Sequence, residues 1–159
     1  MATVYFENRQ DFYTPNPALI HSICDHVLAE FGKSSVEVGV FFISGEEMCD
    51  LHEEHMEDPT LTDCITFPIE TDDPNGYLGD VFIAPVAAKV YLEDLAPNPG
   101  SKKFPLTPEA LGAEITRYLV HTLLHLCGLQ DQTREQSKEM RESEDKFLTQ
   151  LSAKNLLLK

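Results

Sequence analysis

The 159-residue sequence has no tryptophan and few basic residues. Twelve Lys and Arg residues stand against 27 Asp and Glu, which gives a formal net charge of −15 at pH 7. A chain this acidic lacks the cationic surface with which proteins bind DNA non-specifically or attach to anionic membranes. The composition therefore argues against DNA and membranes as partners. A contact with RNA would have to be local, or assisted by a metal ion or by another protein.

Long apolar runs and paired cysteines are also missing. The longest apolar stretch, Tyr118–Leu129, is interrupted by two histidines and falls short of the roughly 20 residues that span a bilayer. The first residues show no secretory signal. The four cysteines form no C-x-x-C pair; they are Cys24, Cys49, Cys64 and Cys127. These features predict a soluble, cytoplasmic protein with reduced thiols.

Strand and helix signals are interspersed along the chain. Strand patterns cover Thr3–Glu7, Val36–Ile43, Asp63–Ile69 and Tyr77–Ala84. Helix patterns run from Thr14 to Gly32, from Ser44 to about Met56, from Pro85 to Leu95, from Pro108 to Cys127 and from about Gln132 to Leu151. The stretch Ala96–Thr107, with three prolines and the only adjacent lysine pair, is expected to be a loop. Without strict βαβ alternation, the pattern predicts one α+β domain over residues 1–159, a small sheet surrounded by about five helices.

The segment Pro108–Gly128 carries most of the residues that could do chemistry. At about 100° per residue, five polar side chains fall on one narrow stripe: Glu114, Arg117, Tyr118, His121 and His125. Most of the remaining helix surface is apolar. A helix that is apolar nearly all round is buried, so its polar stripe is predicted to line an internal cleft.

Within this stripe, His121 and His125 are spaced so that both rings can reach one metal ion. The spacing alone is equally compatible with two hydrogen-bonded histidines in a cleft. Gly128 is expected to end the helix one turn later and to let the chain fold back, which would bring Asp131 within reach. Two histidines and a carboxylate leave coordination positions open, as hydrolytic metal sites require. Cys127 points to another side of the helix and is not expected to be a ligand.

The signatures of other hydrolases are missing. Zinc peptidases with the motif H-E-x-x-H need a glutamate directly after the first histidine, and that position is Thr122 here. Neither G-x-S-x-G nor a phosphate-binding loop occurs. His52 and His55 lie among acidic residues, and we interpret them as part of a solvated helix face.

Three blocks of this sequence, taken in order, resemble the YbeY family. Residues 121–131 (HTLLHLCGLQD) are similar to that family's signature H-G-x-L-H-L-x-G-Y-D-H. Leu51–Pro68 is similar to its L-N-x-x-Y-R-x-x-x-x-P-T-D-V-L-S-F-P segment, and Tyr77–Pro85 to its L-G-D-I-x-I-x-P strand. The resemblance implies an α+β domain with a mixed four-stranded sheet. It also implies a single-strand-specific, metal-dependent endoribonuclease that acts in 3′-end maturation of small-subunit ribosomal RNA and in ribosome quality control.

The resemblance also implies a ligand set. His121 and His125 match the first two of the family's three metal-binding histidines, and the third falls on Asp131. We therefore expect one divalent ion on two histidines and a carboxylate. Zinc is the first candidate, and manganese or nickel are alternatives because the charge of Asp131 makes the ion less Lewis-acidic. If the motif is aligned with a shift of one residue, Gln132 takes the place of the third ligand, but an amide is a poor ligand.

The substrate contacts implied by the resemblance are Asp63, Thr66 and Asp80, which match the family's strand motifs. The basic residue of the family's Y-R pair falls on Met56, which cannot contact phosphate. Arg117, on the ligand stripe, is a candidate replacement, although it could equally pair with Glu114 or Asp131. The implied partners are single-stranded ribosomal RNA and the ribosome or its small-subunit proteins.

Two functions remain open. The first is a metal-dependent endoribonuclease in which His121 and Arg117 are catalytic. The second is a catalytically weak or inactive module of the same fold, which keeps the metal as a structural feature and associates with the ribosome. Met56 and the charge of −15 favour the second, because RNA affinity usually comes from cationic contacts. The three ordered motif blocks favour the first, which we prefer.

Overall fold

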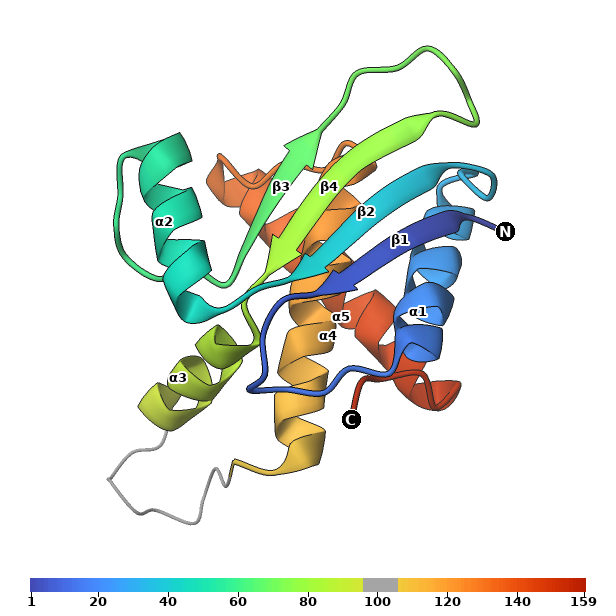
Figure 1. The fold of residues 1–159 in the computed structure, drawn as a ribbon. Coiled ribbons are helices and arrows are strands. Elements are labelled where there is room, and N and C mark those ends of the chain that lie inside the picture. The colour runs from blue at the N-terminus through green and yellow to red at the C-terminus, as the bar shows by residue number, and fades with distance from the viewer. Residues whose placement is uncertain (96–105) are drawn as a thin grey trace.

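A computed structural model of the chain describes residues 1–95 and 106–159. Its centre is one four-stranded sheet of β1 (Thr3–Asn8), β2 (Glu37–Phe42), β3 (Cys64–Pro68) and β4 (Tyr77–Ile83), in the order β1-β2-β4-β3 (Figure 1). β1, β2 and β4 are parallel, and β3 runs antiparallel to β4 at the sheet edge. The predicted mixed sheet is confirmed.

The described residues also form five helices: α1 (Pro17–Glu30), α2 (Gly45–Met56), α3 (Pro85–Leu95), α4 (Pro108–Leu126) and α5 (Arg134–Ala153). α1 and α4 contact the sheet on one face, α5 packs against α4, and α2 lies beside β3 (Figure 1). The predicted α+β fold is therefore confirmed. The predicted loop Ala96–Thr107 lies, up to residue 105, outside the described residues. Within the described ranges, no helix has the length and apolar character needed to cross a bilayer.

Side-chain caps place the helix starts. Asn16 accepts a hydrogen bond from the backbone of α1, and Pro17 follows it, so α1 begins later than the predicted Thr14. Ser44, where the predicted second helix begins, caps α2 by accepting a hydrogen bond from the N–H of Glu47. Thr133 and Gln136 form a reciprocal capping box at the start of α5. These caps leave a short connection between α4 and α5, which becomes part of the candidate site.

α4 is the central helix of the fold. It contacts β3, β4, α1, α3 and α5. Its fully buried side chains include Ile115, Leu119 and Leu123, and the facing sheet contributes Val40 and Val81. Because α4 is packed on several sides, the polar stripe that it does not bury is held in a defined position.

The chain near Leu158 closes against the first half of α4. The hydroxyl of Thr116 donates to the carbonyl of Gly112 (2.7 Å) and accepts from the backbone N–H of Leu158 (3.0 Å). A Cβ on Gly112 would lie 1.9 Å from the Leu158 carbonyl oxygen. Only glycine therefore allows this close approach of the two backbones.

Candidate metal centre and substrate groove

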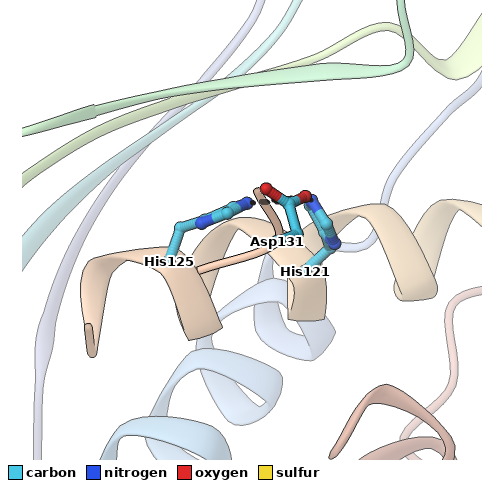
Figure 2. A group of neighbouring side chains, drawn as sticks. All are labelled: His121, His125 and Asp131. Carbon is cyan, nitrogen blue, oxygen red and sulfur yellow. Dashed lines mark hydrogen bonds and ion pairs between the residues drawn. The ribbon is translucent and has the colours of Figure 1, made fainter. Parts of the chain in front are cut away.

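Three ligand atoms converge where α4 meets the connection to α5 (Figure 2). The Nε2 atoms of His121 and His125 are 3.1 Å apart, and Oδ2 of Asp131 lies 3.5 Å from the first and 3.4 Å from the second. These separations would let one ion contact all three atoms at the usual metal–nitrogen distance of about 2.0–2.1 Å. His121, His125 and Asp131 could therefore hold one metal ion, while Cys127 is outside this group.

The turn after α4 brings Asp131 back to the histidines. Gly128 has a φ of 102°, a conformation that favours glycine. Its N–H donates to the carbonyl of His125 (3.0 Å), and the N–H of Leu129 donates to the carbonyl of Leu124 (3.0 Å). These bonds end the helix and reverse the chain, as the position of Gly128 predicts.

Hydrogen bonds also orient both imidazole rings. Nδ1 of His125 donates to the carbonyl of Leu129 (3.0 Å), since a carbonyl can only accept. Nδ1 of His121 is 2.8 Å from Oε2 of Glu144. With Nδ1 protonated, the neutral form of each ring has its Nε2 lone pair directed at the other ring and at Asp131. Three electron-rich atoms at this separation repel one another, so the donor set fits a cation between them.

Glu144 is the residue that sequence reasoning missed. Its side chain is only 6% exposed and contacts both His121 and Arg117. Burial raises the pKa of Glu144, but the hydrogen bonds from His121 and Arg117 outweigh it, and the pKa lies below its usual value. For His121, burial lowers the pKa, but the carboxylate of Glu144 raises it by more. The pKa of His121 therefore lies above its usual value. A signal existed: Glu144 lies on the inward stripe of α5, between buried Met140 and Phe147.

Arg117 has neither of the partners considered from the sequence. Its guanidinium bonds to Oε1 of Glu144 (3.1 Å) and to Oδ1 of Asp145 (2.9 Å). Burial lowers the pKa of Arg117, but these two carboxylates raise it by a larger amount, so the pKa lies above its ordinary value. Arg117 is thus a fixed cation one helical turn from His121.

A groove of about 620 Å³ runs beside the ligand cluster, between α2, the edge strand β3 and the α4–α5 connection. It brings Asp63 and Thr66 together with the three ligands. Met56 also lines it and is 68% exposed. His52, which we placed on a solvated face, lies in this lining as well. No Lys or Arg occurs among the described residues that line the groove.

Asp80 lies elsewhere and is not among the residues that line the groove. Its neighbour Val81 is fully buried beneath the helices, so Asp80 points to the opposite face of the sheet. There its carboxylate accepts a hydrogen bond from Tyr77, in space left by Gly39.

A second cavity of about 220 Å³ adjoins the groove at His121. Glu114, Arg117, Tyr118 and His121 of the predicted stripe line this cavity, and His125 lines the groove. The stripe of α4 therefore lines concave spaces, as expected, but these are open to solvent and not internal.

The fold and the ligand cluster define an α+β protein with a candidate mononuclear metal site in an open groove, which is an arrangement typical of metal-dependent hydrolases. Comparison with known proteins narrows this class. The family described as Endoribonuclease YbeY matches residues 5–152, and the chain belongs to the YbeY family. The resemblance in the three motif blocks is therefore confirmed.

Individual relatives support this family assignment. A Chlamydia abortus protein named Endoribonuclease YbeY is 40% identical over 128 residues, which cover 79% of this chain and 75% of that protein. A Chlamydia pneumoniae protein of the same name is 37% identical over 125 residues, covering 77% and 73%. The solution structure of TM1509 from Thermotoga maritima aligns with a TM-score of 0.62, 18% identity, and coverage of 97% of this chain and 91% of that one. This last likeness shows the shared fold.

Proposed function

We propose that this chain is a metal-dependent, single-strand-specific endoribonuclease that acts in the cytoplasm. Its role would be 3′-end maturation of small-subunit ribosomal RNA and ribosome quality control, with the ribosome or small-subunit proteins as partners. The observation that carries the proposal is the convergence of two imidazole nitrogens and one carboxylate oxygen beside a groove. Membership of a family whose relatives are named endoribonucleases supports it.

The proposed cofactor is one divalent ion held by His121, His125 and Asp131. Two nitrogen ligands and one oxygen ligand suit zinc, and the carboxylate makes manganese and nickel alternatives. When bound, such an ion supplies Lewis acidity for the hydrolysis of a phosphodiester. The chain itself contributes the orientation of the ligands, because Glu144 and the Leu129 carbonyl hold the two rings.

The proposed substrate lies in the groove as a short single-stranded segment, with Asp63 and Thr66 beside it. Arg117 is the proposed phosphate contact. Only two of its five N–H donors are needed for the bonds to Glu144 and Asp145, and the side chain lines the cavity next to His121. Since Arg117 is held by two carboxylates, it would meet a phosphate without losing further side-chain freedom.

The alternative function is a catalytically weak or inactive module that associates with the ribosome. One observation favours it specifically: the described lining of the groove has no Lys or Arg, and Met56, which the motif resemblance matches to the family's basic residue, is exposed there. Because cationic contacts dominate RNA affinity, a groove without them binds RNA weakly.

The first experiment is metal analysis of protein purified without added metal. We expect close to one equivalent in the unaltered protein, a large loss in His121→Ala, and no change in His21→Ala, a matched exposed histidine of α1. Equal metal content in all three proteins would refute the proposed centre.

The second experiment measures cleavage of single-stranded and duplex ribosomal RNA fragments with zinc, manganese and nickel. We expect cleavage of the single strands only, and a loss of about tenfold or more in Arg117→Ala, because hydrogen bonds to charged groups contribute about 1.5–3 kcal/mol. Arg134→Ala, an exposed arginine at the start of α5, is the control. If metal binds and no RNA is cut, the alternative function replaces the first.

A further inference from the structure

The smaller cavity begins at the candidate metal centre and extends away from the groove. Asp63, Cys64 and His121 line both spaces. An RNA chain that passes His121 would therefore have the groove on one side and this cavity on the other. Its volume of about 220 Å³, against about 620 Å³ for the groove, suits one nucleobase and not a run of nucleotides.

Two carboxylates form the acceptor wall of the cavity. Burial raises the pKa of Glu114, although Arg117 and Arg141 act in the opposite direction. Asp63 accepts a weak hydrogen bond from the thiol of Cys64 (3.3 Å). Among the described residues, no Lys, Arg or His comes within ion-pair distance of either carboxylate. They are therefore strong acceptors with capacity left for N–H donors of a ligand.

Aromatic and cationic side chains form the other walls. Tyr118 is 5% exposed and closes the cavity beside Glu114, whereas Tyr91 of α3 is 41% exposed and is the tyrosine with surface available to a base. Arg117 and Arg141 both approach Glu144, at 3.1 and 3.8 Å. Tyrosine rings and guanidinium planes are the surfaces on which unpaired RNA bases stack, and arginine also bonds phosphate. One cavity thus offers acceptors for a base edge together with surfaces for its flat face.

We propose that this cavity is a subsite for a single guanine base of the RNA chain, adjacent to the phosphate at the metal centre. Guanine presents a ring N–H and an amino group side by side, and a carboxylate accepts both in parallel. Adenine and cytosine place a ring acceptor next to the amino group, and uracil flanks its N–H with two carbonyls. Carboxylate oxygens repel those acceptors, so the same wall discriminates against the other three bases. The proposal rests on the proposed ribonuclease function.

The test is the affinity of the full-length protein for the four nucleoside 5′-monophosphates, measured by calorimetry or NMR titration. We expect guanosine monophosphate to bind about tenfold or more tightly than the others, as one bidentate base contact provides. Glu114→Gln or Asp63→Asn should abolish this preference. Glu139→Gln, which alters an exposed carboxylate on α5, should retain it. Equal affinity for all four nucleotides, or a preference that survives both cavity substitutions in folded protein, would overturn the subsite.

Cleavage assays separate this proposal from the proposed function. Oligoribonucleotides that differ only in the base next to the cut should be cleaved fastest with guanine there. Cleavage without base preference would refute the subsite and leave the nuclease standing. Guanosine monophosphate preference in a protein that cuts no RNA would refute the nuclease and leave the guanine site standing.

Discussion

Removing the carboxylate of Glu144 should weaken metal binding although Glu144 is not itself a ligand. Its Oε2 lies 2.8 Å from Nδ1 of His121, and its side chain is 6% exposed. Loss of an outer carboxylate that orients a metal-binding histidine typically costs 10–100-fold in metal affinity, about 1.4–2.8 kcal/mol. We expect Glu144→Leu to fall in this range. Glu144→Gln keeps a neutral acceptor of about half the strength, so this variant should lose metal affinity by about tenfold or less.

Zinc affinity can be measured by competition with a chromophoric chelator, on protein shown to be folded by circular dichroism. ¹⁵N NMR of the His121 ring adds a readout that general destabilisation does not move, because Glu144 determines which ring nitrogen carries the proton. Glu142→Gln is the matched control. Its side chain is 66% exposed and reaches only Lys138 among the described residues, so zinc affinity should not change.

Wild-type zinc affinity in folded Glu144→Leu would refute this reasoning. It would mean that the packing of α4 alone orients His121 and that the bond to Glu144 contributes nothing. A loss in Glu142→Gln equal to that in Glu144→Gln would also contradict it, since the effect would then come from net charge.

Two further predictions concern stability. Gly112→Ala should lower the free energy of unfolding by about 1–3 kcal/mol, the usual cost of overpacking, because its Cβ would meet the Leu158 carbonyl at 1.9 Å; an unchanged urea midpoint would show that the two backbones separate freely. Zinc at about 100 times its dissociation constant should add about 2.7 kcal/mol to the stability of the protein, and chelation should remove it. The increment should be absent in His125→Ala, and a melting temperature that ignores the chelator in unaltered protein would argue against a bound ion.

The features that sequence reasoning predicted are those with short-range causes. β1 and β4 differ from their predicted ranges by one residue, because strand alternation is visible in a few residues. The stripe on α4 follows from the helical period alone. The return of Asp131 follows from a glycine that ends the helix. Each of these needs no knowledge of what packs against the segment.

The features that it missed depend on packing between distant segments. Glu144 is 23 residues beyond His121 in the sequence, and the two side chains meet only because α5 packs along α4. Arg117 is paired for the same reason. The position of His52 in the groove depends on how α2 lies relative to β3. These relations were not visible in local patterns, although a glutamate on the buried stripe of α5 was a usable signal.

The three candidate ligands differ in how tightly the fold constrains them. The histidines stand on α4, which is packed on several sides, whereas Asp131 belongs to the turn between two helices, where its backbone carbonyl accepts a hydrogen bond from Ser137. Changing the third ligand therefore disturbs no helix and leaves the imidazole pair in place. A single substitution at Asp131, in evolution or by design, could therefore change the ligand hardness and the net charge of this centre.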